Sequence, residues 1–201
     1  MSFSHHHEVA AKKAFATLHM IKRSFHRISP KDFQTLYSVY VRPILEYASQ
    51  VVHTGLQKDA LSLEHVQQKA TKMVNVIRHE SYERRLQILH LFPLEARRLR
   101  GDMIYLFKLF ASDQTSTLFT QNSSDNLRGH GKKLFKIRPR TFIRQHFFTF
   151  RTVTPWNNLP SSIVNAPNVN SFKVLLDVYL GLSTVSPLPI TQRGSATPCF
   201  S

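Results

Sequence analysis

The residues with the clearest chemical pattern form a run that carries only one sign of charge. Between Asn126 and Leu176 the sequence contains no aspartate or glutamate. Basic side chains stand in this run at Arg128, Lys132, Lys133, Lys136, Arg138, Arg140, Arg144, Arg151 and Lys173. Aromatic side chains are interleaved with them, at Phe135, Phe142, Phe147, Phe148, Phe150 and Trp156. Because cations neutralise phosphates and aromatic rings stack on bases, the pattern favours nucleic acid as the ligand.

The candidate nucleic-acid contacts come mainly from this run. They are Arg128, Lys132, Lys133, Lys136, Arg138, Arg140, Arg144, Arg151, Phe142 and Trp156. A second basic group on a predicted helix adds Arg97 and Arg100, which form either a further contact or an ordinary solvated face partly offset by Glu95 and Asp102. The rings also have a structural alternative. Phe147, Phe148 and Trp156 could instead pack inward and bury a hairpin against the last helix.

No arrangement of residues typical of an enzyme is present. A two-metal polymerase or nuclease site needs clustered carboxylates, whereas the 12 acidic residues of this sequence are scattered and none adjoins another. The glycine-rich phosphate loops and the Gly-x-Ser-x-Gly nucleophile turn are absent. His5, His6 and His7 are consecutive, so on a helix they point to different faces and do not form a metal site together. We therefore expect no catalytic residue, no metal, no cofactor and no small-molecule substrate.

The bulk composition agrees with a folded, basic chain. The sequence has 201 residues, a formal net charge of +15 and 42% hydrophobic residues, which is enough for a core. A bound polyanion would relieve the self-repulsion of such a charge. The single cysteine excludes an internal disulfide, no run of 18 apolar residues predicts a membrane span, and the first residues do not resemble a signal peptide. We expect a nuclear or cytoplasmic protein that is not secreted and does not contact a membrane.

The elements that must position these residues are mainly helices in the first half. Apolar residues at helical spacing predict helices over residues 5–27, 59–79 and 94–111, with a short one ending near residue 91. Ser29-Pro30-Lys31-Asp32 is a helix start signal, and Pro43 should kink the helix that follows. Ser81 offers another cap, and Gly55 marks the end of an element.

The pattern changes after a polar stretch. Residues 113–126 are rich in Ser, Thr, Asn, Gln and Asp and predict a linker. Residues 134–151 alternate apolar and basic side chains, which predicts two strands with a turn near Pro139 and Arg140. A last helix, capped by Ser171, should end near Tyr179. The predicted organisation is a helical region (1–112), a linker (113–126), a basic aromatic unit (127–180) and a disordered tail (181–201).

Several short blocks follow one another in a recognisable order. They include Leu36-Tyr37-x-x-Tyr40-Val41-Arg42-Pro43-Ile44-Leu45-Glu46-Tyr47, Leu63-Glu64-x-Val66-Gln67-x-Lys69-Ala70, Leu94-Glu95-x-Arg97-Arg98-x-Arg100-Gly101-Asp102, Leu127-Arg128-Gly129-His130, Phe147-Phe148-x-x-Arg151 and Trp156-Asn157-x-Leu159-Pro160. Together they resemble the region after the catalytic palm in reverse transcriptases of non-LTR retrotransposons, of the jockey and chicken-repeat kind. The resemblance covers about residues 2–180.

This resemblance implies a fold, a partner and a missing part. It implies a mainly α fold, with a helical thumb-like bundle followed by a small basic β-hairpin plus helix unit, α+β overall. The implied partners are RNA or an RNA–DNA duplex, and the polymerase palm, whose catalytic aspartates lie outside this chain. The chain departs from the family at Val51-Val52-His53, where relatives often carry a Trp, and it lacks the Cys/His zinc knuckle of some relatives. We therefore expect a nucleic-acid-binding terminal fragment with no activity of its own; the alternatives are a protein-interaction module and a non-functional product of a transposable element.

Overall fold

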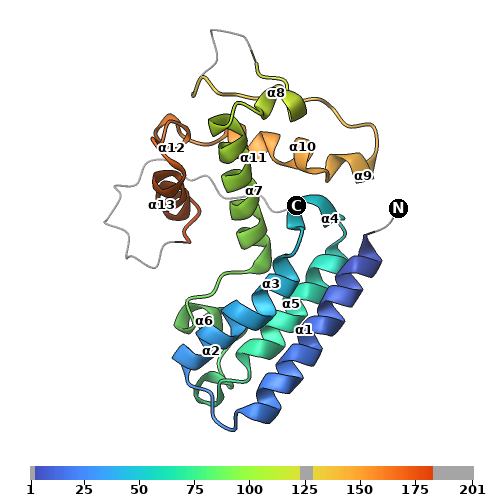
Figure 1. Cartoon of the computed structure of the whole chain (residues 1–201), viewed down its shortest axis with the longest axis vertical. Coiled ribbons are helices and arrows are strands. Elements are labelled where there is room, and N and C mark those ends of the chain that lie inside the picture. Colours follow the sequence, from blue (N-terminus) through green and yellow to red (C-terminus); the bar gives the residue numbers. More distant parts are fainter. Residues whose placement is uncertain (1–2, 123–128, 183–201) are drawn as a thin grey trace.

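Helices account for nearly all of the regular structure in the computed structural model, which describes residues 3–122 and 129–182 (Figure 1). In chain order the elements are α1 (Ser4–Ser24), α2 (Pro30–Leu36), the π-helical turn η1 (Tyr37–Val41), α3 (Arg42–Glu46), α4 (Ser49–Val52), α5 (Gln57–Thr71), the 3₁₀ turn η2 (Asn75–Ile77), α6 (Tyr82–Ile88), α7 (Leu94–Ala111), α8 (Thr115–Leu118), α9 (Phe142–Gln145), α10 (Phe148–Arg151), α11 (Val153–Asn157), α12 (Ser161–Val164) and α13 (Val169–Tyr179). The mainly α prediction is confirmed.

The predicted β-hairpin is wrong. Residues 142–145 and 148–151 form the short helices α9 and α10, and the only strand pairing within the described residues is one isolated antiparallel bridge between Gln121 and Leu134. The helical turn of α9 is favoured locally because the Thr141 hydroxyl accepts a hydrogen bond from the Arg144 amide at 3.3 Å, as an N-cap does. The alternation of apolar and basic residues therefore reflects exposed rings beside exposed cations, not the two faces of a strand.

Local signals in the first half set the helix boundaries well. The Ser29 hydroxyl accepts from the Asp32 amide at 3.2 Å, and Pro30 opens α2. Ser81 caps α6 in the same way. Upstream of Pro43 the helix widens into η1, where the Arg42 amide bonds to the Tyr37 carbonyl, so the distortion expected near this proline is a π-type turn.

Several helix boundaries differ from the prediction: α1 ends at Ser24 and α6 at Ile88, each three residues early, and the largest differences are in α5 and the last helix. α5 stops at Thr71, short of the predicted end at residue 79. The Thr71 hydroxyl donates to the Gln68 carbonyl and accepts from the buried Arg85 guanidinium, both at 2.9 Å, which holds this turn in place. The last helix is capped by Asn168, not by Ser171, because the Asn168 side chain accepts the Ser171 amide at 2.8 Å.

The buried apolar side chains form two clusters. The first gathers α1, α2, η1, α3, α5 and α6 around Leu18, Tyr37 and Val66, and the second surrounds Trp156 and Phe172. The helix α7 belongs to both, because Leu94 lies in the first cluster and residues 103–109 contribute to the second. In Figure 1, α7 accordingly runs from the lower, N-terminal half into the upper, C-terminal half.

The division between the clusters falls inside α7, upstream of the predicted linker at 113–126. Part of that stretch is packed: α8 lies in it, and Thr115 and Phe119 are buried. Residues 123–128 of the predicted linker lie outside the described residues, as does most of the predicted disordered tail, residues 183–201.

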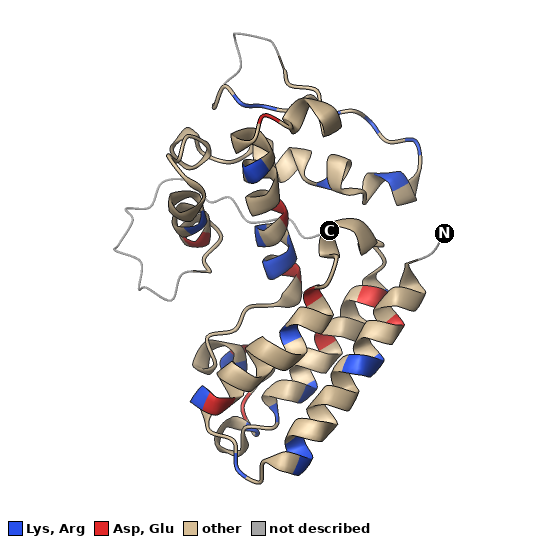
Figure 2. Cartoon of the chain, viewed as in Figure 1, with Lys and Arg blue, Asp and Glu red and all other residues tan. Residues whose placement is uncertain are grey.

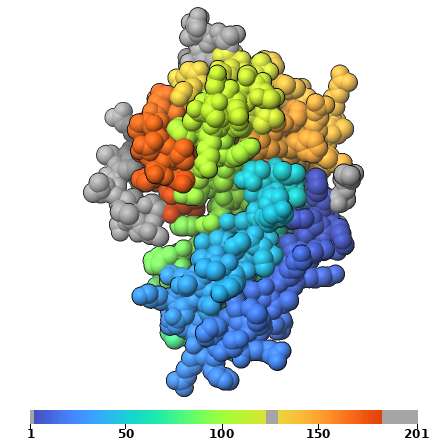
Figure 3. Space-filling model, in the orientation of Figure 1, coloured from blue at the N-terminus to red at the C-terminus, as the bar shows by residue number. Residues whose placement is uncertain are grey.

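Besides α7, the side chain of Arg151 connects the N-terminal half, around the first cluster, to the C-terminal half, around the second. Arg151, at the end of α10, donates from Nε and Nη2 to the two carboxylate oxygens of Asp102 on α7, each at 2.9 Å. It also donates to the carbonyls of His146, Ser49 and Gln50, at 2.9, 3.3 and 3.4 Å. Since Ser49 and Gln50 belong to α4, one guanidinium joins three elements. Figure 3 shows the two halves in contact along this junction.

Candidate nucleic-acid interface

The start of the basic run is anchored to the second hydrophobic cluster. Trp156 donates from its indole Nε1 to the Lys132 carbonyl at 2.8 Å. The Asn157 side chain accepts from the Leu134 amide at 2.9 Å and donates to the Leu134 carbonyl at 2.8 Å. The Phe135 amide donates to the Thr120 carbonyl at 2.8 Å. These contacts fix the backbone up to residue 135, so the side chains beyond it start from a defined position.

From this anchor the chain passes over the surface to α9 as a basic arch, defined here as residues 132–147. Its exposed cations are Lys132, Lys136, Arg138, Arg140 and Arg144, and none of these five forms an ion pair with another described residue. Phe135, Phe142 and Phe147 are 55%, 55% and 47% exposed, although the Phe142 ring also contacts the His146 ring, with centroids 4.4 Å apart. Figure 2 shows blue and no red along the segment that enters α9. Arg144 also lies over the Phe150 ring, with its guanidinium carbon 5.3 Å from the centroid. The arch thus presents exposed cations without ion-pair partners beside exposed rings.

Trp156 does not belong to this surface. Its side chain is fully buried, stacked on Phe110 with ring centroids 4.9 Å apart and lying 6.2 Å from Phe172 of α13. The prediction that Trp156 contacts nucleic acid is therefore wrong, and the alternative in which this ring packs against the last helix is confirmed. Among the other two rings of that alternative, Phe148 is half-buried and Phe147 is exposed.

Three predicted arginines are engaged with carboxylates instead. Arg97 is paired with Glu46, Arg100 with Asp177 and Arg151 with Asp102. The hydrogen bond to Asp177 raises the pKa of Arg100. A phosphate would have to displace a carboxylate from each guanidinium, so these side chains join elements rather than offer free charge.

Two further predicted contacts have a different status. Lys133 is half-buried, in contrast to its exposed neighbour Lys132. Arg128 lies outside the described residues.

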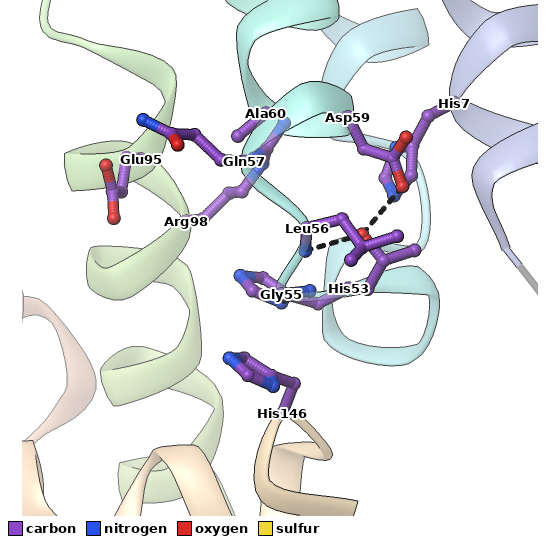
Figure 4. Close-up of a pocket in the computed structure, with 11 residues that line it drawn as sticks. His7, His53, Gly55, Leu56, Gln57, Asp59, Ala60, Glu95, Arg98 and His146 are labelled. Carbon is purple, nitrogen blue, oxygen red and sulfur yellow. Dashed lines mark hydrogen bonds between the residues drawn. The ribbon is translucent and has the colours of Figure 1, made fainter. Parts of the chain in front are cut away.

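A pocket of about 580 Å³ lies at the junction of the two halves, and Figure 4 shows His53 and His146 facing each other in it. Their rings are stacked, with centroids 6.0 Å apart. His53 Nδ1 accepts the Gly55 amide at 3.0 Å, so the neutral ring carries its proton on Nε2. Burial, followed by the charges of Arg151 and Arg98, lowers the pKa of His53 to about 4. The ring is therefore neutral near pH 7.

Two other histidines of this pocket form hydrogen bonds with backbone carbonyls of the chain. His7 Nε2 donates to the Val52 carbonyl at 2.9 Å, and His146 Nδ1 donates to the Phe142 carbonyl at the same distance. Burial lowers the pKa of Arg98, whose Nη2 has no hydrogen-bond partner among the described residues. Sequence reasoning missed this pocket because His53 and His146 come from opposite halves of the chain and share no motif. Within the described residues no group of three or more potential metal ligands is present.

Gly55→Ala tests whether this junction is closely packed. Gly55 has φ +69°, and a Cβ there would lie 2.1 Å from the His146 ring. We expect the free energy of unfolding to fall by about 2 kcal/mol, from left-handed strain of about 1 kcal/mol and from overpacking. In a His146→Ala background, the fall in the free energy of unfolding caused by Gly55→Ala should shrink to the contribution of the left-handed strain. Urea denaturation followed by circular dichroism measures both differences, and equal costs in the two backgrounds would show that His146 does not pack on Gly55.

Comparisons with known proteins identify no relative, since no protein-family model, curated protein or solved structure matches the chain. None of the helices in residues 3–122 and 129–182 is both long enough and apolar enough to cross a bilayer.

Proposed function

We propose that this chain binds nucleic acid through the basic arch, and that it is a C-terminal fragment of a retrotransposon RNA-directed DNA polymerase without its catalytic palm. The observation that carries the proposal is the arch itself. Five exposed cations without ion-pair partners among the described residues are interspersed with three exposed phenylalanine rings. Base stacking on an aromatic ring contributes about 1–3 kcal/mol per base, and cations beside it follow the phosphates.

The proposal separates a binding surface from the groups that support it. Trp156 and Asn157 hold the arch backbone, while Arg151 holds α10 against α7 and α4. A binding surface supported in this way needs no carboxylate chemistry. The chain would therefore grip a nucleic acid while another polypeptide supplied catalysis.

Fluorescence anisotropy of a labelled RNA hairpin and a matched DNA duplex tests the proposal. If each of the five free cations neutralises one phosphate, the logarithm of the binding constant should fall with a slope of about −4.5 against the logarithm of salt concentration. Binding should then weaken about 500-fold between 50 and 200 mM salt. The ratio of the two affinities gives the preference for RNA or DNA. A chain shown by circular dichroism to be folded that does not bind, or that binds equally at both salt concentrations, would refute the proposal.

A second candidate function, contact with another protein, is favoured by exposed apolar side chains on η1, directly after α3, and on α4. Val39, Tyr40, Tyr47 and Val51 are 58%, 52%, 70% and 66% exposed. Large exposed apolar side chains close together in the chain are a feature of protein-contact surfaces. In the proposed parent enzyme, the palm would be the natural partner for this surface.

A further inference from the structure

A second hollow lies at the far end of the molecule from the basic arch. It has a volume of about 760 Å³, within the range of small-ligand sites, and lies between the end of α1 and the segment that follows α5. In Figure 1 these two segments are at the bottom, whereas α9 is near the top. This basic groove, named for the four cations described next, therefore shares no residue with the arch.

The groove is lined by positive charge only. Lys22 comes from α1, Lys69 from α5, Lys72 from the end of α5, and Arg78 follows η2. No aspartate or glutamate is among the lining residues, and three histidines add further nitrogen donors or acceptors. All four cations are exposed, and none of their side chains forms a hydrogen bond or ion pair with another described residue. Like charges gathered around one hollow focus a positive potential into it.

The same groove has an apolar wall. Phe25 is 46% exposed, and Met73, which follows Lys72 in the chain, is half-buried. An exposed phenylalanine offers a face on which a planar group can stack, and a methionine thioether adapts to such a group. A ligand that fits both features has several linked negative charges and a flat ring system.

We propose that the basic groove binds a ligand in which several closely spaced phosphates accompany a planar base. Lys22, Lys69, Lys72 and Arg78 receive the phosphates, and Phe25 with Met73 receives the base. This chemistry occurs in a free nucleoside triphosphate and in consecutive nucleotides of a nucleic-acid strand. The proposal goes beyond the function assigned to the arch, because it rests on different residues at the other end of the molecule.

The three lysines also have a simpler possible role, which the experiment must distinguish from ligand binding. Lys22, Lys69 and Lys72 stand at the C-terminal ends of α1 and α5, where cations stabilise the unpaired helix carbonyls by about 0.3–1 kcal/mol each. That role predicts a loss of stability on substitution without any ligand. A direct binding measurement separates the two roles.

The test is the binding of a fluorescent nucleoside triphosphate, N-methylanthraniloyl-ATP, to the full chain. Lys69→Glu with Lys72→Glu should weaken binding at least 10-fold. The matched control is Lys12→Glu with Lys13→Glu, two exposed α1 lysines outside the groove, which makes the same change in net charge and should have less than a 2-fold effect. Arg78→Glu, outside the α-helices, is a second variant in case the first one loosens α5. Equal losses in the groove and control variants, or no binding by the unsubstituted chain, would overturn the proposal.

Competitors identify the source of the phosphates. Displacement by inorganic tripolyphosphate but not by a 12-nucleotide RNA supports a free nucleotide, whereas displacement by both supports a nucleic-acid strand. A variant with neutralised arch cations should keep its affinity for the fluorescent nucleotide. The groove proposal and the arch proposal can therefore fail independently.

Discussion

Arg151→Met lowers the free energy of unfolding by about 3–5 kcal/mol, because it leaves the Asp102 carboxylate buried without its partner. The Asp102 side chain is only 5% exposed and that of Arg151 13%. The carbonyls of Ser49, Gln50 and His146 lose their donor at the same time. Urea denaturation followed by circular dichroism measures the change. Arg100→Met is the matched control, because its pair with Asp177 is about a quarter exposed on both sides and should contribute no more than about 1 kcal/mol.

The same variant has a defined pH dependence. Burial raises the pKa of Asp102, and the hydrogen bond and charge of Arg151 oppose that rise. Removing Arg151 raises this pKa further, so the folded variant holds a proton at pH values where the unfolded chain has lost it. Stability of the variant should therefore fall as pH increases from about 4 to 7, and its deficit should be smallest at the acid end. A deficit that stays constant across this range would mean that Asp102 is not the group left unpaired.

Neutralising four cations of the arch lowers nucleic-acid affinity by about 100-fold or more at 50 mM salt, with little change in stability. The variant carries Lys136→Ala, Arg138→Ala, Arg140→Ala and Arg144→Ala. Four lost phosphate contacts should reduce the salt slope by about 3.6. The melting temperature should hold because all four side chains are exposed and lack ion-pair partners among the described residues. Anisotropy titrations at 50 and 200 mM salt give both quantities.

The control for this variant removes the same charge elsewhere. Alanine at Lys12, Lys13, Arg27 and Lys31 takes four exposed cations from the N-terminal half, outside both the arch and the groove. It should lower affinity only slightly, through net charge. If both variants lose affinity equally, the arch is not the binding surface and the attraction is a general effect of the charge of +15.

The sequence was a good guide wherever the information is local. The Ser29-Pro30 start signal and the apolar spacing from Leu94 to Ala111 predict elements that the structure contains, because capping and helical periodicity depend on nearby residues. The arch cations and the exposed Phe142 were also identified from the sequence. These side chains lie on the surface because the arch contains too few apolar residues to form a core around them.

The sequence failed where distant residues decide. Trp156 is buried because Phe110 of α7 and Phe172 of α13 enclose it, and no local pattern records either contact. Arg97, Arg100 and Arg151 look like free cations until the fold brings Glu46, Asp177 and Asp102 to them. The alternation of apolar and basic residues in the α9–α10 segment predicts a hairpin, but the same alternation also arises when exposed rings stand beside exposed cations on short helices. Only the burial of the rings in the fold distinguishes these two explanations.

Because α7 continues from the first hydrophobic cluster into the second, the number of its residues between Leu94 and Met103 fixes how the two clusters are oriented to each other. Each residue of an α-helix turns the chain by about 100° and advances it by about 1.5 Å. One residue inserted or deleted between Leu94 and Met103 would rotate the whole second cluster about the helix axis relative to the first. Asp102 would then face away from the guanidinium that joins it to α4, and His146 would leave Gly55. An insertion or deletion in this part of α7 should therefore disturb the junction more than a substitution at an exposed position such as Glu95.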